Sequence, residues 1–286
     1  MLKKSKIFNA FYQCVKKNKN KGIKMEIIKG LTNEAYRAMD GLSASDIKAI
    51  LANPYKFKQG IKRPASTAQN IGSAVHSLIL EPKNFERDFI IADFDKRTKA
   101  GKEQAEQAEV SGKILLKPSE FETAQNVADS FKESEFYKEN FIKDFGEAES
   151  SYFSEFEGVK VKCRPDYFNL SKNIIIDLKT TSNDNGANPN EFLKAVANYG
   201  YYIQAQWYLN ITGAKQFLFV ALETAEPYCF AVYELDQSFI DLAAEKIDKA
   251  LNIYKNLAHY SKEYKNEFWD GEPQILTAPA WLFYEK

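Results

Sequence analysis

The sequence has few of the residues and motifs that mark several common protein classes. Its 286 residues include three cysteines, Cys14, Cys163 and Cys229, which lie far apart. An odd number at this spacing forms no disulfide framework, so the sequence predicts a protein of the reducing cytoplasm. No apolar run approaches the roughly 18 to 20 residues that span a bilayer, so no membrane partner is expected. The motifs of serine hydrolases, zinc proteases and P-loop nucleotidases are also missing, which argues against those enzymes.

The chain has no excess charge of either sign. It contains 39 Lys and Arg residues and 39 Asp and Glu residues, so it is not a generally basic nucleic-acid coat, and any contact with nucleic acid must be local. Strand alternation over residues 159–164 places Lys160, Lys162 and Arg164 on one face, the same side as Asp166. This face is either a solvated strand surface or a stripe that contacts phosphates.

Residues 1–24 differ from the rest, since they carry eight lysines and no acidic residue. A secretory signal needs a longer apolar region and a cleavage site, so none is predicted. Residues 7–15 could form a short amphipathic helix that contacts DNA or a membrane. The alternatives are a disordered tail, or extra residues upstream of a true start at Met25. We expect one domain over residues 25–286.

Hydrophobic periodicity predicts an α/β fold with a mixed central sheet flanked by helices. A capping box at Ser43 and Asp46 begins a helix that Pro54 ends, and residues 95–113 read as a mobile loop or a polar helix. A helix is expected over 118–140. The core begins with a hairpin of strands 151–156 and 159–168, and a third strand follows at 173–179. Helices at 190–198 and 201–210, strands at 216–222 and 228–235, and a helix from Asp236 to about 259 complete the prediction.

The segment Asp177-Leu178-Lys179 ends the apolar run 174–176. Side chains alternate along a strand, so Asp177 and Lys179 project from one face about 7 Å apart. A buried carboxylate and ammonium are costly without partners, and a divalent metal with a phosphate would provide them. Arg164-Pro165-Asp166 supplies a second carboxylate eleven residues upstream. A surface ion pair at a strand end is the simpler alternative.

Two helices carry further candidates. His76 follows Gly72 by one turn, and the glycine can admit another backbone beside the imidazole; the alternative is a packed core histidine. Gln204 lies between Tyr201 and Tyr208 on one helical face. A buried amide needs partners, so Gln204 is the unusual residue of what could otherwise be an aromatic core helix.

These pieces occur in the order Gly-x-x-x-His, Arg-Pro-Asp, Asp-x-Lys-Thr-Thr and Gln-x-x-x-Tyr. That order resembles the RecB-like branch of the PD-(D/E)xK nucleases, and most closely the RecE-type (exonuclease VIII) nuclease domain. Residues 42–54 look like that family's opening helix and residues 148–151 like its first core strand, so the resemblance covers about 31–284. Tyr202 stands where these proteins usually have histidine, and the cysteine cluster of some RecB-like nucleases is missing.

The resemblance implies a restriction-endonuclease-like core and a set of site residues. The implied Mg²⁺ ligands, for which Mn²⁺ would substitute, are Asp166, Asp177, His76, Glu149 and the backbone carbonyl of Leu178. Lys179 would position the attacking water or stabilise developing negative charge, which makes Lys179, Asp177 and Asp166 the catalytic candidates. Gln204 and Tyr208 would contact the DNA backbone. No organic cofactor is expected.

The resemblance also implies an activity and partners. It suggests a phage or prophage 5′→3′ exonuclease that acts on double-stranded DNA ends and leaves 3′ single strands for recombination. A single-strand annealing protein would then be a partner, and a ring-shaped homo-oligomer the assembly. The alternative is a non-catalytic DNA-binding or assembly module built on the same fold.

Overall fold

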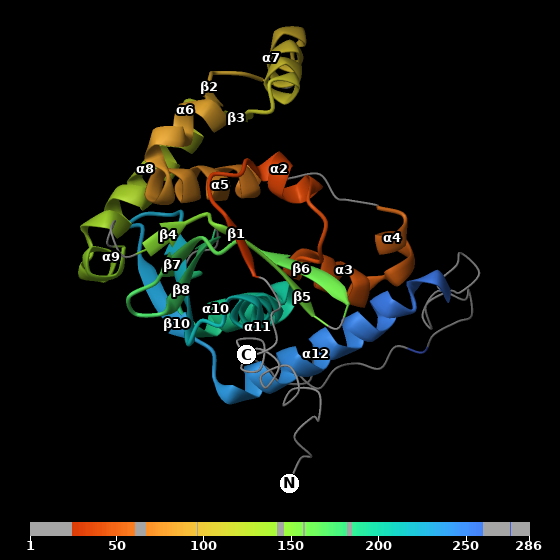
Figure 1. Cartoon of the computed structure of the whole chain (residues 1–286). Coiled ribbons are helices and arrows are strands. Elements are labelled where there is room, and N and C mark those ends of the chain that lie inside the picture. The colour runs from red at the N-terminus through yellow and green to blue at the C-terminus, as the bar shows by residue number, and fades with distance from the viewer. Residues whose placement is uncertain are drawn as a thin grey trace.

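The computed structural model describes residues 25–60, 67–95, 97–141, 146–156, 158–181, 185–259 and 275 (Figure 1). The predictions for residues 1–24, including Cys14, lie outside this part of the chain. Among the described residues, no helix has the length and apolar character needed to cross a membrane.

A five-stranded mixed sheet lies at the centre of the molecule. In spatial order its strands are β10 (Phe230–Glu234), β9 (Gln216–Glu223), β8 (Ile174–Thr181), β7 (Tyr167–Asn169) and β4 (Gly146–Ala148). β8 and β9 run parallel, and the other neighbours run antiparallel. A parallel pair needs a crossover connection, and two helices between β8 and β9 provide it. The predicted mixed sheet is therefore confirmed.

Helices cover both faces of this sheet. One face carries α5 (Thr67–Leu80) and α8 (Pro118–Glu133), and the other carries α3 (Ala44–Ala52), α10 (Pro189–Tyr199), α11 (Tyr201–Thr212) and α12 (Gln237–Lys255). Alternation along β8 sends Ile176 and Leu178 into the core beside α5, while Ile175 packs in the core beside α11. Asp177 and Lys179 share the side of Ile175, so the sheet separates the two cores and directs both polar side chains toward α11.

A smaller antiparallel sheet continues from the central one. It contains β1 (Glu26–Ile28), β5 (Ser151–Phe156) and β6 (Val159–Cys163). The predicted single strand over 159–168 is wrong, because β6 ends at Cys163 and β7 begins in the other sheet at Tyr167. Pro165 lies at the break, where its missing N–H cannot extend a ladder. The chain also changes sheets between β4 and β5, at Glu149.

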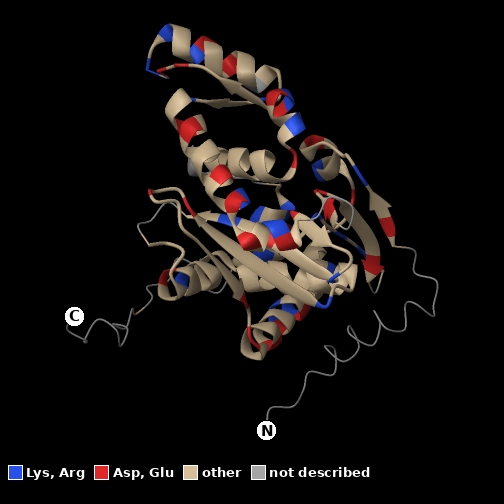
Figure 2. Cartoon of the chain, turned by 90° about the vertical axis from the view of Figure 1, so that its left-hand side faces the viewer, with Lys and Arg blue, Asp and Glu red and all other residues tan. Residues whose placement is uncertain are grey.

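The remaining elements lie at the periphery. They are α2 (Asn33–Ala38), α4 (Pro54–Lys58), the 3₁₀ turns η1 (Pro82–Asn84) and η2 (Leu257–His259), α6 (Phe85–Asp88), β2 (Phe89–Ile91), α7 (Lys99–Val110), β3 (Ile114–Leu116) and α9 (Glu135–Asn140). The parallel pair β2 and β3 projects from the body together with α7, on which Lys99 and Lys102 precede the glutamates (Figures 1 and 2). Of the two predictions for 95–113, the polar helix is therefore correct for Lys99–Val110.

Two local predictions need adjustment. The helix expected over 118–140 is two helices, because Ser134 ends α8 and its side chain accepts a hydrogen bond from Tyr137 N–H at the start of α9. The last long helix ends at Lys255. The predicted capping box at Ser43 and Asp46 is confirmed.

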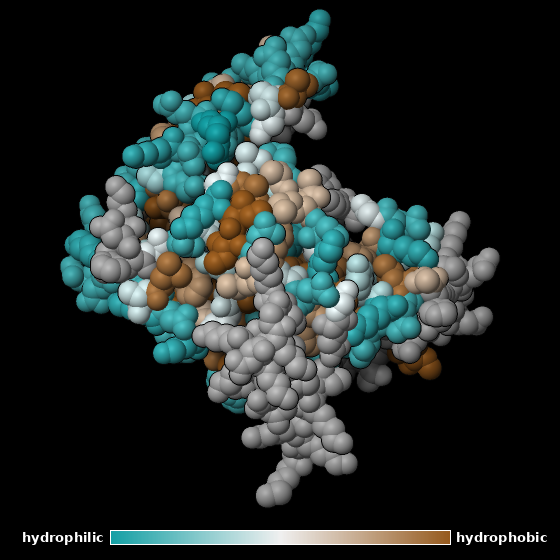
Figure 3. Space-filling view, in the orientation of Figure 1, coloured by the Kyte–Doolittle hydropathy of each residue, from teal (hydrophilic) through white to brown (hydrophobic). Residues whose placement is uncertain are grey.

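Hydrophobic residues gather over β1 on the face shown in Figure 3, where Met25 and Ile27 are exposed.

Candidate active site

Asp177 and Lys179 lie side by side at the end of β8, as their alternation predicts. The Asp177 carboxylate is fully buried. One of its oxygens accepts a hydrogen bond from the Lys179 ammonium, and the other accepts a 2.6 Å hydrogen bond from the Gln204 amide of α11. A buried Gln204 amide was expected to need a hydrogen-bond partner, and that partner is Asp177. The surface ion pair considered from sequence is excluded, because this pair is enclosed between β8 and α11.

Two aromatic rings flank the Lys179 ammonium. The nitrogen lies 5.0 Å from the centre of the Tyr201 ring and 5.9 Å from that of Phe219. Cations are attracted to the faces of aromatic rings at such distances. Tyr201 was not among the predicted site residues, although it shares the predicted helical face with Gln204. Asp177 and the two rings together hold the ammonium in one place.

Glu149 and Asp166 lie where the chain crosses from one sheet to the other. Glu149 has a left-handed backbone, with φ of 49°, and its N–H donates to the Asp166 carbonyl over 3.1 Å. A non-glycine residue in this conformation is strained and persists where its surroundings hold it, often at functional sites. The crossing explains why residues 17 positions apart come together: the two bends face one another across the paired strands.

The Asp166 carboxylate closes the end of the ladder between β7 and β8. The pairing of these two strands ends at Tyr167 and Ile176. The Leu178 N–H of β8 lies beyond that point, and it donates a hydrogen bond to Asp166 Oδ2 over 2.7 Å. The same oxygen lies 3.4 Å from His76 Nδ1. These contacts fix the carboxylate between β8 and α5. The role predicted for the Leu178 carbonyl remains a prediction.

Helix α5 brings His76 to this point because Gly72 allows it to approach β8 closely. A Cβ atom at Gly72 would lie only 2.8 Å from Thr180 Oγ1. The expected close approach is therefore present, but the atom that lies against Gly72 is a side-chain oxygen of β8 and not the backbone that was predicted. His76 lies one turn further along α5, half-buried over the sheet edge.

Donor atoms of His76, Glu149 and Asp166 all lie within 4.8 Å of one another. Two carboxylates and an imidazole, each half-buried, can hold a divalent cation and leave positions open for water or substrate. Within the described residues, Asp177 does not join this group. The structure thus brings together three of the four predicted side-chain ligands and directs the fourth, Asp177, toward Lys179 and Gln204.

Burial and like charge disturb the titration of these groups. Burial, followed by the nearby Asp166 charge, raises the pKa of Glu149 well above its usual value. Burial raises the pKa of Asp177 to about 6, although Lys179 opposes the shift. Burial disfavours the charged form of Lys179, but Asp177 outweighs this and leaves the pKa of the lysine above its ordinary value. A bound cation would relieve the repulsion between Glu149 and Asp166.

The predicted phosphate-facing stripe needs correction at Lys162 and Arg164, because both side chains are buried. Lys162 donates to backbone carbonyls of α2, including that of Tyr36 over 3.0 Å. Arg164 donates to Ser151 Oγ over 2.9 Å and to the Leu31 carbonyl over 3.1 Å. Their charges hold the segment around α2 against β6. Backbone carbonyls have no sequence signature, so the residue pattern of this segment does not identify them as partners of Lys162 and Arg164.

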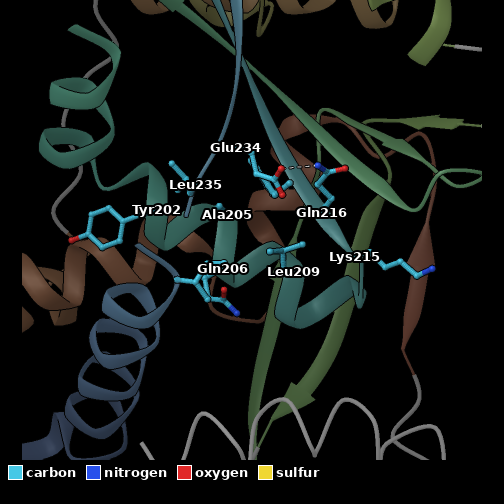
Figure 4. Close-up of a pocket in the computed structure, with 10 residues that line it drawn as sticks. Tyr202, Ala205, Gln206, Leu209, Lys215, Gln216, Glu234 and Leu235 are labelled. Atoms are coloured by element: carbon cyan, nitrogen blue, oxygen red, sulfur yellow. Dashed lines mark hydrogen bonds between the residues drawn. The ribbon is translucent and has the colours of Figure 1, made fainter. Parts of the chain in front are cut away.

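Two other features of α11 bear on the predictions. Tyr208 lies one turn from Gln204, packs edge-on against Phe217, and has its pKa raised by burial. Its proposed contact with DNA remains a prediction. A cavity of about 60 Å³ lies between α11, β9 and β10, lined in part by Tyr202 and by the hydrogen-bonded pair Gln216 and Glu234 (Figure 4). None of the predicted site residues lines this cavity.

Comparison with known proteins identifies the family and supports the fold. A family model described as a PDDEXK-like domain of unknown function (DUF3799) matches residues 43–266, and the chain belongs to this family. The predicted PD-(D/E)xK superfamily and fold are confirmed, whereas the particular closeness to the RecE type remains a prediction. No curated protein matches the chain.

Two solved structures illustrate the likeness. A candidate exonuclease from Eubacterium rectale is 17% identical, with a TM-score of 0.55 over 88% of this chain and 96% of that one. This likeness shows a shared fold. A phage-related exonuclease from Haemophilus somnus 129PT is 18% identical, with a TM-score of 0.31 over 78% of this chain and 97% of that one. At that score the second match adds nothing to the argument.

Proposed function

We propose that this protein is a metal-dependent deoxyribonuclease that degrades double-stranded DNA from its ends. The observation that carries the proposal is the cluster of His76, Glu149 and Asp166 at the strand end that also holds Lys179. A nuclease needs a cation site next to a positioned proton donor or water-orienting group, and this cluster and Lys179 would supply them. A non-catalytic module has no need to keep all of these groups.

The residues divide the chemistry between two groups that meet at the end of β8. His76, Glu149 and Asp166 would hold the cation, Mg²⁺ or Mn²⁺, which when bound polarises the phosphate and lowers the pKa of a bound water. Lys179 would donate hydrogen bonds to the phosphoryl oxygen or to the attacking water as negative charge develops. Asp177, which Gln204 holds by a hydrogen bond, and the two flanking rings keep the ammonium in place, so it needs no rearrangement during the reaction.

The end preference and polarity come from the family resemblance. By that likeness the enzyme works 5′→3′, leaves a 3′ single strand for an annealing protein in recombination, and assembles as a ring. The Eubacterium rectale structure, whose fold this chain shares, is that of a candidate exonuclease, which favours action at ends over internal cleavage.

A time course on linear and circular duplex DNA tests the proposal. With Mg²⁺ or Mn²⁺ the protein should degrade the linear form and spare the covalently closed circle, and EDTA should stop the reaction. Substrates blocked at one 5′ or 3′ end would then report polarity. Equal loss of circles would indicate an endonuclease. Binding without cleavage under every metal condition would instead support the non-catalytic module.

A further inference from the structure

An exposed aromatic ring extends the Lys179 site toward solvent. Tyr199 is the last residue of α10, and 63% of its surface is accessible. Its ring centre lies 5.6 Å from that of Tyr201, which in turn lies 5.0 Å from the Lys179 nitrogen. These two steps place the Tyr199 ring within 10.6 Å of the catalytic lysine candidate.

The position of Tyr199 is fixed by its backbone. Gly200 takes a left-handed conformation, with φ of 62°, at the corner between α10 and α11. Lys48 of α3 lies against this glycine and donates to the Tyr199 carbonyl over 3.1 Å. A Cβ at Gly200 would lie 3.1 Å from the Lys48 side chain, so the glycine keeps this contact open. The ring is thus presented from a firmly held corner and does not contribute to the core.

We propose that Tyr199 stacks against an unpaired nucleobase at the DNA end. The inference rests on the proposed function and specifies its substrate: a terminus whose last bases are frayed or single-stranded. Exposed aromatic rings bind bases of any sequence by stacking, at about 1–3 kcal/mol per base. Successive phosphates of one strand are spaced about 3.4 Å apart as measured along the axis of a duplex. The ring therefore lies within about three nucleotides of a phosphate held at Lys179.

Stacking at this place would serve removal of nucleotides from an end. A base pair next to the scissile phosphate holds the strand in the duplex, and a base drawn out of the helix onto the Tyr199 ring is released from that pair. Tyr201 lies between the stacked base and the ammonium, with its ring toward Lys179. The Tyr199 and Tyr201 pair would therefore hold the base and the phosphate of one strand in a fixed relation.

Binding measured without metal separates this inference from catalysis. The probe is a duplex with 2-aminopurine at a mismatched terminal position, in EDTA, and the readouts are Kd by anisotropy and 2-aminopurine fluorescence. Tyr199→Leu should raise Kd for the frayed end about ten-fold and abolish the quenching seen with the parent, whereas Tyr199→Phe should retain both. Leu193→Ala is the control, because Leu193 is 52% exposed on the same helix. Thermal melts establish that each variant is folded.

The outcomes distinguish the two proposals. Loss of quenching in Tyr199→Leu, with retention in Tyr199→Phe, supports stacking. A parent that cleaves linear DNA while Tyr199→Leu binds and quenches equally well overturns the stacking inference and leaves the nuclease function intact. A parent that neither binds nor cleaves DNA overturns both.

Discussion

Replacing Glu149 with glutamine should make the metal-free protein more stable, although it removes a proposed ligand. The donor atoms of Glu149 and Asp166 lie within 4.8 Å. Two unit charges at that separation repel by about 3 kcal/mol at an effective dielectric constant of about 20. The site is half-buried and partly screened, so we expect a gain of about 1–2 kcal/mol in the free energy of unfolding at pH 8. That corresponds to a rise in Tm of roughly 2–4 °C per kcal/mol.

The sign of the pH dependence follows from the direction of the shift. The pKa of Glu149 is raised in the folded protein above its ordinary value of 4.5. A carboxyl shifted in this way favours folding below its unfolded pKa and loses that contribution as pH rises through the folded value. The advantage of Glu149→Gln should therefore be small near pH 4 and grow toward neutral pH.

Metal should reverse the order of stability. A ligand that binds only the folded state stabilises it by RT ln(1 + [L]/Kd), about 2.7 kcal/mol at 100 times Kd. The parent should gain this with Mn²⁺, and Glu149→Gln should gain much less. Thermal melts at pH 8, in EDTA and in Mn²⁺, measure the crossover, with exposed Glu122→Gln on α8 as the control. A variant less stable than the parent in EDTA would refute the reasoning, because Glu149 would then make a net favourable contact in its charged form.

Two further predictions concern β8 and its neighbours. Lys179→Arg should bind DNA ends about as well as the parent and cleave them at least about 100-fold more slowly, since the planar guanidinium misses the point where the compact ammonium acts; unchanged cleavage in single-turnover assays would remove Lys179 from the catalytic role. Gly72→Ala should lower the free energy of unfolding by about 1–3 kcal/mol, because its Cβ meets Thr180 Oγ1. Urea denaturation measures this loss, and adding Thr180→Ala should restore part of it. If Gly72→Ala is as stable as the parent, that result would contradict the close approach of α5 to β8.

Local rules predicted much of this fold. Strand alternation placed Asp177 and Lys179 on one face, and hydrogen-bonding need identified Gln204 as a polar residue with a specific partner. The capping box at Ser43 and the order of strands and helices also followed from short-range pattern. These features depend on residues that are close together in the chain, so local patterns in the sequence were enough to predict them.

Features set by distant segments could not be read in this way. The bends at Glu149 and Asp166 arise because one hairpin is shared between two sheets, and a linear pattern shows only a longer strand. Lys162 and Arg164 looked like a surface stripe because their partners are backbone carbonyls, which have no sequence signature. The choice of which carboxylates meet at one point likewise depends on how α5 and α11 pack on opposite faces.

A titration with Mn²⁺ followed by electron paramagnetic resonance tests the central claim most directly, since it detects the bound ion without relying on activity. The cluster of His76, Glu149 and Asp166 predicts one site of defined stoichiometry in the parent. Asp166→Asn should weaken binding by about 10- to 100-fold or more, and Asp177→Asn, whose carboxylate faces Lys179, should weaken it less. Equal Mn²⁺ affinity in the parent and in Asp166→Asn would contradict the account.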